Sequence, residues 1–334
     1  MRNRLCILLT LGALAGGLYA QTAAAEKPAH AAKKSWSAPR LADGHPDLQG
    51  VWTNATLTPL TRPAQFKDKP TVSDAEAKAY EQHDLKLNDI DDPNAPLLAR
   101  AGSAGTGGYN NLFIDRGSEL ARVDGVKRTS LIVDPANGQM PMRTDRQTRR
   151  GGGGEGEGYA GLSYDSVKRR PLAERCLIGF GSTSGPPMMP VLYNNNYQIV
   201  QTADRIMILV EMVHDVRVIR MNAQHDPPSI HKWLGDSIGH WEGDTLVVET
   251  TNVYDLNRFR GSTDQFKVTE RFQRVDANTI LYRATIDDPG AYTQPWTIEY
   301  PFRAAPGQVY EYACHEGNYA MPDILGGARK EEGK

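Results

Sequence analysis

From Asn196 onward the chain is a succession of short β-type runs joined by tight turns, and this pattern constrains the fold most. Explicit turn sequences stand between the runs, such as Glu242-Gly243-Asp244 and Asp276-Ala277-Asn278. Successive strands with tight turns form an antiparallel meander, and this many strands close into a barrel or a curved sandwich. No helix alternates with the strands, so a dinucleotide-binding α/β fold is not expected. The predicted strands lie near Gln198–Gln201, Ile206–Val213, Val216–Met221, Thr245–Thr251, Phe266–Val275, Thr279–Ile286, Trp296–Phe302 and Val309–Cys314.

The first 25 residues have the features of a secretory signal peptide. Arg2 and Arg4 precede an apolar run over Leu5–Leu18, and small residues follow it. This order is typical of a cleaved signal, and the run is too short to span a bilayer as a helix. We therefore expect a periplasmic or secreted protein, cleaved after Ala20 or after Ala25. Such a protein has no access to cytosolic ATP or nicotinamide pools.

The mature chain is expected to form one β-rich domain over residues 46–334, with a short N-terminal helix and long loops. Residues 26–45 are rich in Ala, Lys and Pro, which indicates a flexible leader. A Gly-x-Trp at Gly50–Trp52 opens the first strand, and a strand is also expected over Arg128–Val133. A Ser-x-x-Glu capping box predicts a helix over residues 73–87. The four consecutive glycines within residues 149–158 lack a following Lys-Ser/Thr, so we expect a flexible loop and not a phosphate loop.

The net charge of the chain limits the classes of partner that it is expected to bind. Loss of Arg2 and Arg4 takes the basic residues from 38 to 36 against 40 acidic residues, so the mature chain is slightly acidic. Nucleic acids and anionic membranes both favour a basic surface, so neither is expected as a partner. After signal cleavage no integral membrane segment is expected. The expected partner is a small molecule, and no cofactor is expected.

Two cysteines remain once Cys6 leaves with the signal. Cys176 and Cys314 would meet an oxidising compartment, where an isolated pair is most simply a disulfide. Two free thiols are the alternative. Neither spacing resembles CxxC, so a zinc ribbon or a thioredoxin-type site is not expected.

Strand alternation places several polar side chains on inward faces. In the run Phe266–Val275, Glu270 falls on the same face as Phe266, Val268 and Phe272. Tyr282 takes the corresponding position in the next strand. Trp296, Ile298, Tyr300 and Phe302 follow the same rule in the run after it. A carboxylate on such a face needs a partner or a raised pKa.

His214 continues the inward line of Ile208, Val210 and Met212, and it stands next to Asp215 and close to Arg217. A barrel interior that combines aromatic rings with a carboxylate, a phenol and an imidazole has the composition of a small-molecule pocket. It also holds an acid–base pair for proton transfer. The alternative is a structural network in which a buried Glu is hydrogen-bonded to Tyr or paired with Arg.

Other chemistries have less support from the sequence. Five histidines lie near acidic residues in the C-terminal part, which allows a metal site, but no pair has a recognised ligand spacing; they are His214, His225, His231, His240 and His315. No Gly-x-Ser-x-Gly motif points to a serine nucleophile. Asn194-Asn195-Asn196-Tyr197 could donate amide hydrogen bonds to a ligand.

The chain resembles a large group of exported bacterial proteins of unassigned function. The matching stretches are Pro46–Trp52, Thr129–Pro135, Glu174–Cys176, Leu192–Thr202, Glu211–Arg217, Trp233–Gly235, Trp241–Thr251 and Tyr310–Tyr319. The resemblance covers most of the mature chain and implies export and a β-rich single domain, but no reaction. The Gly50-Val51-Trp52 start is also similar to the opening of lipocalin-like barrels.

We therefore expect a lipocalin-like barrel that acts as a cofactor-independent lyase or isomerase on a small apolar or aromatic molecule. The catalytic candidates are His214 or Glu270 as base, Tyr282 as hydrogen-bond donor to a developing charge and Asp215 orienting His214. Replacement of Glu270 by Gln would then abolish turnover and leave the fold intact. The substrate-binding candidates are Asn196, Tyr197, Arg217, Trp296 and His315. The alternative functions are a lipocalin-like binding protein without catalysis and a metal-dependent hydrolase.

Overall fold

A computed structural model describes residues 36–87, 115–144, 164–305, 307–314 and 319–333. The described residues from Ser37 onward belong to one compact unit. The predicted signal peptide, the glycine-rich loop at 149–158 and His315 lie outside the described residues. In the part of the predicted leader that is described, Arg40 pairs with Asp244 at 2.6 Å, and the His45 ring stacks on Trp241.

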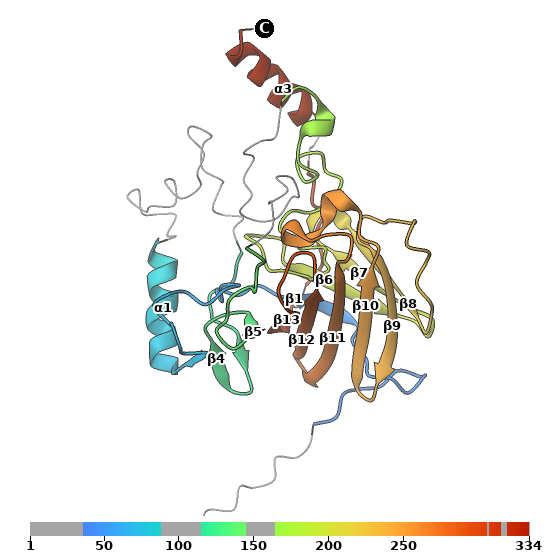
Figure 1. The fold of residues 1–334 in the computed structure, drawn as a ribbon. Helices are drawn as coiled ribbons and strands as arrows, with labels where there is room; N and C mark the ends of the chain where they lie inside the picture. The colour runs from blue at the N-terminus through green and yellow to red at the C-terminus, as the bar shows by residue number, and fades with distance from the viewer. Residues whose placement is uncertain (1–35, 88–114, 145–163, 306, 315–318, 334) are drawn as a thin grey trace, which may run out of the picture. The chain divides into compact units, whose positions relative to one another are not determined.

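Nine strands of the described chain pair into a closed barrel, which confirms the mainly β fold class. Figure 1 shows how the strands are arranged. In their order around the barrel, the strands are β1 (Gly50–Thr53), β6 (Asn196–Gln201), β7 (Arg205–Val210), β8 (Val216–Met221), β9 (Asp236–Glu242), β10 (Thr245–Thr251), β11 (Lys267–Asp276), β12 (Thr279–Asp287) and β13 (Trp296–Ala304). Each strand pairs with the one that follows it in this order, and β13 pairs back to β1 and closes the barrel.

The meander is interrupted once, between β8 and β9, which pair in parallel while the other barrel pairs are antiparallel. A parallel pair cannot be joined by a hairpin, because the chain must return to the end where the first strand began. Residues 222–235 make this return, and we call them the crossover loop. The loop ends at Gly235, whose φ is +74° and where a Cβ would lie 2.7 Å from the Thr251 main-chain oxygen.

A small sheet and a helix lie beside the barrel. Strands β2 (Thr71–Val72), β4 (Val126–Arg128) and β3 (Arg122–Val123) form the small sheet, and β5 (Ile132–Asp134) pairs with the barrel strand β13. Helix α1 (Asp74–Leu87) begins at the predicted capping box, where the Ser73 hydroxyl accepts the Glu76 N–H and Glu76 accepts the Ser73 N–H at 2.9 Å. The predicted helix is confirmed.

Four short 3-10 segments lie in the described connections: η2 (Val167–Arg169), η3 (Met212–His214), η4 (Asp255–Asn257) and η5 (Phe259–Gly261). The predicted strand at Val309–Cys314 is wrong: residues 308–313 have no regular structure, and helix α3 (Ala320–Glu331) follows. Strand β9 was not predicted, because Asp236, Gly239 and Glu242 are residues that strands disfavour. The predicted strand Arg128–Val133 is divided between β4 and β5.

The barrel core follows the predicted alternation. Val268, Glu270 and Phe272 of β11 are buried, and so is every second residue of β12 from Ile280 to Ile286. Tyr282, Tyr300 and Phe302 form a cluster of rings with centroids 5.0–5.8 Å apart. Aliphatic side chains such as Ile280, Ile286 and Ile298 pack with these rings in the same core, and the rings bury large areas per residue.

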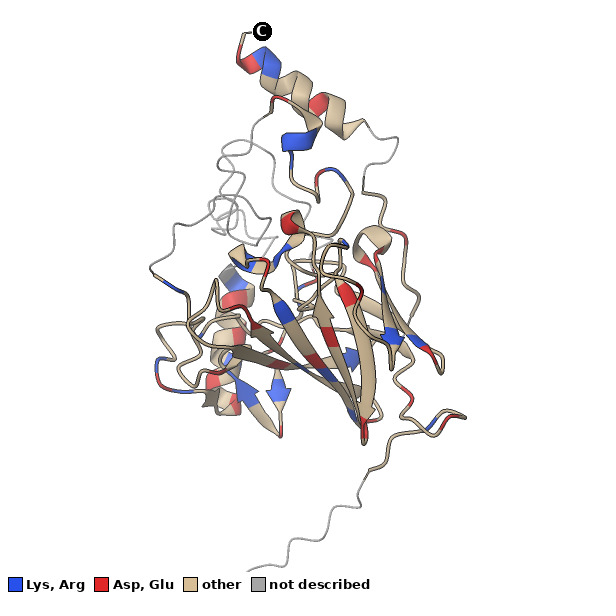
Figure 2. Cartoon of the chain, turned by 45° about the vertical axis from the view of Figure 1, so that its right-hand side comes forward, with Lys and Arg blue, Asp and Glu red and all other residues tan. Residues whose placement is uncertain are grey.

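Charges of both signs are interspersed along the outer face of the strands, as Figure 2 shows. Ion pairs link strands across this face: Arg271 of β11 with Glu242 of β9 at 2.7 Å, and Arg283 of β12 with Glu299 of β13 at 3.7 Å. Within the described residues, no helix is long and apolar enough to cross a bilayer.

Cys176 and Cys314 form a disulfide, which confirms the predicted pairing. The bond ties residues 307–314 to the segment around Cys176, where Cys314 also lies close to the Ala173 carbonyl. Next to it, the Tyr312 N–H donates to His214 Nε2 at 2.9 Å and the Tyr312 ring stacks on Tyr193.

Candidate functional site

A buried ion pair joins Arg217 of β8 to Glu270 of β11. The two guanidinium nitrogens of Arg217 lie 2.6 and 3.0 Å from the two carboxylate oxygens of Glu270, and the side chains are 1 % and 0 % exposed. The Tyr282 hydroxyl donates to Glu270 at 2.8 Å. Alternation along β8, β11 and β12 brings the three groups together, so three of the predicted site residues do converge.

Met188, in the segment before β6, contacts this cluster through its main chain. The Met188 N–H donates to the Tyr282 hydroxyl at 2.9 Å, and the Tyr300 hydroxyl donates to the Met188 carbonyl. Met188, Met189 and Val191 are part of the barrel's hydrophobic core. Glu270 is thus paired with Arg217 and hydrogen-bonded to Tyr282, which is the arrangement of the structural network that the sequence left open.

Burial sets the protonation of this cluster. Burial raises the pKa of Tyr282 well above its ordinary value, and the neighbouring Glu270 charge raises it further. Burial works to lower the pKa of Arg217, but the Glu270 carboxylate outweighs it and the pKa rises. The phenol is thus a neutral hydrogen-bond donor and the guanidinium is charged.

His214 does not join the buried cluster. β7 ends at Val210, and residues 212–214 form a 3-10 segment in which His214 has a φ of +55° and is exposed. The prediction that His214 continues the inward line of β7 is wrong, because alternation holds only where the backbone stays extended. Asp215 accepts the Ser184 hydroxyl at 2.6 Å and the Gly179 N–H at 3.2 Å, and burial raises its pKa.

The other predicted binding residues are separated. The Tyr197 hydroxyl is buried between Asn54 and Thr183, and the Asn196 amide donates to Glu211 at 2.9 Å. Trp296 is fully buried and packs against Tyr292 and Phe259. The catalytic and binding roles of all these residues stay predictions.

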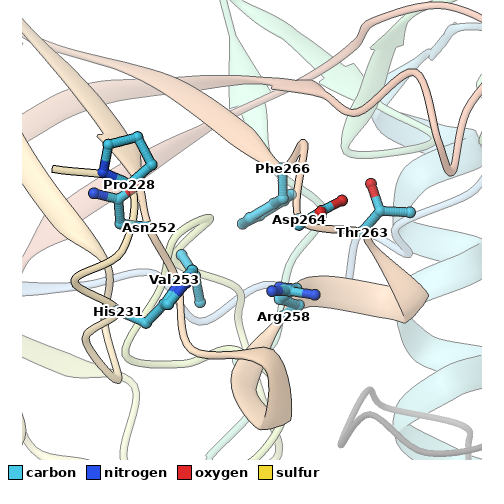
Figure 3. A pocket seen from close by; sticks show the side chains of 8 residues that line it. All are labelled: Pro228, His231, Asn252, Val253, Arg258, Thr263, Asp264 and Phe266. Carbon is cyan, nitrogen blue, oxygen red and sulfur yellow. The ribbon is translucent and has the colours of Figure 1, made fainter.

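An accessible cavity of about 330 Å³ lies at the end of the barrel where β10 stops and β11 begins. We call it the rim cavity, and Figure 3 shows its lining. Val253, Phe266 and Pro228 supply its apolar part; its polar side chains are His231, Asn252, Arg258, Thr263 and Asp264.

Three ionisable side chains of the rim cavity have no partner among the described residues. Within that part of the chain, His231, Arg258 and Asp264 form neither a hydrogen bond nor an ion pair. Figure 3 shows His231 on one side of the cavity and Asp264 on the other, with Arg258 and the Phe266 ring between them. An imidazole, a guanidinium and a carboxylate are thus available to a bound molecule.

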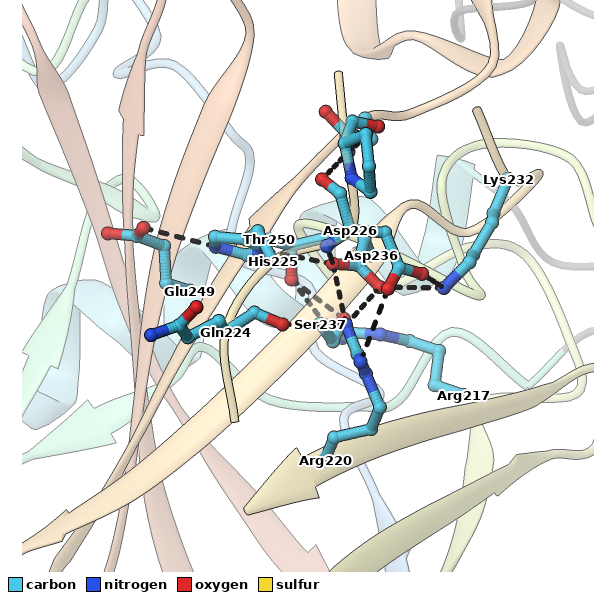
Figure 4. A network of polar contacts seen from close by, with 12 residues as sticks. Arg217, Arg220, Gln224, His225, Asp226, Lys232, Asp236, Ser237, Glu249 and Thr250 are labelled. Atoms are coloured by element: carbon cyan, nitrogen blue, oxygen red, sulfur yellow. Dashed lines mark hydrogen bonds and ion pairs between the residues drawn. The ribbon is translucent and has the colours of Figure 1, made fainter. Parts of the chain in front are cut away.

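The crossover loop that carries His231 is held by a buried carboxylate. Asp236 is 1 % exposed and accepts from Arg220 at 2.9 Å, from Lys232 at 2.7 Å and from the Asp226 N–H at 2.9 Å. His225 Nδ1 lies 3.0 Å from Asp236. Figure 4 shows the arrangement of this network. Because these donors come from both ends of the loop, the network fixes one wall of the rim cavity.

The opposite wall is anchored by Asp288. This carboxylate is 1 % exposed and accepts both the N–H and the hydroxyl of Thr263, the latter at 2.6 Å. It also accepts the Gly290 N–H at 3.0 Å. Thr263 and the neighbouring Asp264 therefore have a defined position, which a binding site requires.

Asp236 is expected to make the folded protein sensitive to acid. Burial works to raise its pKa, but hydrogen bonds from Lys232, the Asp226 N–H and His225 together lower it. A carboxylate with a lowered folded-state pKa adds stability above its unfolded pKa of about 3.9, and this stability is lost as the pH falls through the folded-state pKa. The difference in unfolding free energy between the wild-type chain and Asp236→Asn, measured in urea from pH 7 to pH 3, should therefore shrink below about pH 4.

Asp204→Asn is the matched control, because Asp204 is exposed and lies 3.6 Å from its partner Arg205. Its unfolding free energy should follow that of the wild type over the whole range. A wild-type advantage over Asp236→Asn that stays constant down to pH 3 would contradict the prediction.

Sequence reasoning found only part of the rim cavity. It singled out His231 as a possible metal ligand, but it missed Arg258 and Asp264, because no motif or spacing connects them. Among the described residues, no group of three His, Cys, Asp or Glu side chains is placed to hold a metal ion.

No protein-family model, no curated protein and no solved structure shows significant similarity to this chain.

Proposed function

We propose that this protein is an exported, cofactor-independent enzyme that transfers a proton on a small organic molecule bound in the rim cavity, as a lyase or isomerase does. The observation that carries the proposal is a set of three ionisable side chains around one cavity, His231, Arg258 and Asp264, to which the described chain offers no partner. Ionisable groups gathered in a concave site are the usual mark of a binding or catalytic site.

Two of the three groups have direct roles in the proposed proton transfer. An imidazole is the side chain best suited to accept a proton at neutral pH, so His231 is the candidate base. The Arg258 guanidinium can bind an oxygen that gains negative charge when a neighbouring C–H bond is broken. Val253 and Phe266 supply contact for an apolar part of the substrate. The proton removed by His231 returns to the substrate at the same or another carbon, or leaves with a departing group.

The disulfide supports an exported location. Bonds such as Cys176–Cys314 persist in oxidising compartments and are rare in the cytosol. Together with the signal-like N-terminus and the resemblance to exported proteins, this supports a periplasmic or secreted enzyme.

Deuterium exchange tests the proposal without a known substrate. A panel of small ketones and ketoacids is incubated with the protein in D₂O, and binding is followed by saturation-transfer NMR and exchange of α-hydrogens by mass spectrometry. At least one compound should bind and gain deuterium. His231→Gln should lower its exchange rate at least about 100-fold, since general-base catalysis contributes about 10²–10⁴. Arg258→Gln should weaken binding at least about tenfold, through loss of a charge-assisted hydrogen bond.

His240→Gln is the control, because His240 is an exposed histidine on β9 that pairs with Glu242 and does not line the cavity. It should exchange at the wild-type rate. If the compounds bind, and His231→Gln and Arg258→Gln alter this binding, but no deuterium is exchanged, the protein binds small molecules and is not an enzyme. Exchange that is unchanged in His231→Gln would remove His231 as base.

A further inference from the structure

A second cavity lies at the opposite end of β11, where the barrel closes. It has a volume of about 710 Å³ and is bordered by β1, the β11–β12 turn and the end of β13. We call it the base cavity. Its lining includes Arg274 and Arg303, the amides of Gln49 and Asn278, and apolar atoms of Val51 and Trp52. Its volume is in the range of cavities that hold small organic ligands.

Both arginines bind only neutral groups among the described residues. Arg274 donates to the Asp47 carbonyl at 2.6 Å and to the Ala277 carbonyl at 3.0 Å, and its guanidinium lies over the Trp52 ring. Arg303 donates to the Thr279 hydroxyl at 3.0 Å. Neither forms an ion pair in the described chain, whereas Arg271 and Arg283 on β11 and β12 both do.

Two carboxylates that neighbour lining residues in the sequence accept main-chain hydrogen bonds and do not line the cavity. Asp47 accepts the Gln49 N–H at 2.9 Å, and Asp276 accepts the Asn278 N–H at 2.8 Å, so each closes a turn of the main chain. Glu119, whose pKa is lowered chiefly by Lys127 and slightly by Arg303, pairs with Lys127 at 2.7 Å. No described carboxylate therefore lines the cavity as a counter-charge to its two positive charges.

We infer that the base cavity binds an organic carboxylate with a non-polar body, independently of the rim cavity. Guanidinium groups match the planar, two-oxygen geometry of a carboxylate and form charge-assisted hydrogen bonds with it. Val51, Ala304 and Ala305 line the same cavity and provide contact for the non-polar body. The volume is far larger than an inorganic ion needs.

Calorimetric titration with benzoate, acetate and inorganic phosphate tests this inference. Benzoate should bind at least about tenfold more tightly than acetate and more tightly than phosphate, because only benzoate combines a carboxylate with a large non-polar body. Arg303→Gln should weaken benzoate binding at least about tenfold. Arg303 is exposed and has one hydrogen bond to a side chain, so its replacement leaves the main-chain contacts of the cavity in place.

Arg283→Gln is the matched control: Arg283 is exposed on β12 and lies outside the base cavity. It should bind benzoate as the wild type does, and so should Arg258→Gln in the rim cavity. Equal effects of Arg303→Gln and Arg283→Gln would overturn the inference. So would the absence of benzoate binding, or equal binding of acetate or phosphate. Loss of benzoate binding in Arg258→Gln alone would assign the ligand to the rim cavity and would also overturn it.

Discussion

Glu270→Gln should lower the free energy of unfolding by about 3–5 kcal/mol, because it leaves the Arg217 charge buried without a counter-charge. Arg217 is 1 % exposed, and its remaining partners are the hydroxyls of Ser237 and Thr250, each at 3.3 Å. Neutral hydroxyls at this distance do not replace a carboxylate at 2.6 Å. Urea unfolding followed by circular dichroism measures the loss.

Two variants show whether the loss comes from the unpaired charge. Arg217→Met combined with Glu270→Leu removes both charges and keeps apolar volume, so it should recover most of the stability. Asp244→Asn breaks the surface pair with Arg40 and should cost less than about 1 kcal/mol. If Glu270→Gln unfolds at the wild-type urea concentration, the buried pair does not contribute as described.

The same variant separates the two interpretations of Glu270 that the sequence allowed. If Glu270 is the partner of Arg217 and no more, the folded fraction of Glu270→Gln should keep the deuterium exchange of the rim cavity. If Glu270 is the base, exchange should be lost in protein that is still folded. The side chain is 0 % exposed and its described contacts are with Arg217 and Tyr282, which favours the first outcome.

The barrel was largely predictable because its strands obey a local rule. Where the backbone is extended, side chains alternate, so the inward positions of Glu270 and Tyr282 follow from their neighbours in the sequence. The same rule failed at His214, where the chain leaves the strand after Val210. Alternation predicts which face of the sheet a side chain lies on only for residues within the strand.

The rim cavity depends on an arrangement that local patterns do not reveal. The parallel pairing of β8 and β9 requires the crossover loop, and that loop brings His231 to the end of the barrel. A hairpin between the two strands would leave no wall at this position. Strand pairing is a contact between distant residues, and no turn sequence between Met221 and Asp236 distinguishes the two arrangements.

The segment that fills the barrel interior could not be predicted from the sequence either. Residues 186–191 are largely buried, and Met188 binds Tyr282 and Tyr300 through its main chain. These hydrogen bonds connect residues more than 90 positions apart. This segment, whose sequence is typical of a Pro/Gly loop, therefore occupies the predicted interior pocket. The accessible cavities lie at the two ends of the barrel instead.

Replacement of both Cys176 and Cys314 by Ser should lower the free energy of unfolding by about 4–5 kcal/mol, because the disulfide closes a long loop of the unfolded chain. The two cysteines are 138 positions apart, and the cost of closing a loop grows with its length. The bond also holds Tyr312 next to His214 and Tyr193, so residues 307–314 should become a site of early proteolysis in the variant.

Reduction of the wild-type protein provides the control for this second prediction. Wild type in reducing buffer should unfold at the same urea concentration as the double serine variant, and the reducing agent should not change the variant. Each single serine variant should match the double variant, because one cysteine cannot form the bond. The prediction would be contradicted if the wild-type protein keeps its full stability after a thiol assay has shown that both cysteines are reduced. The packing of residues 307–314 would then hold that segment without the disulfide.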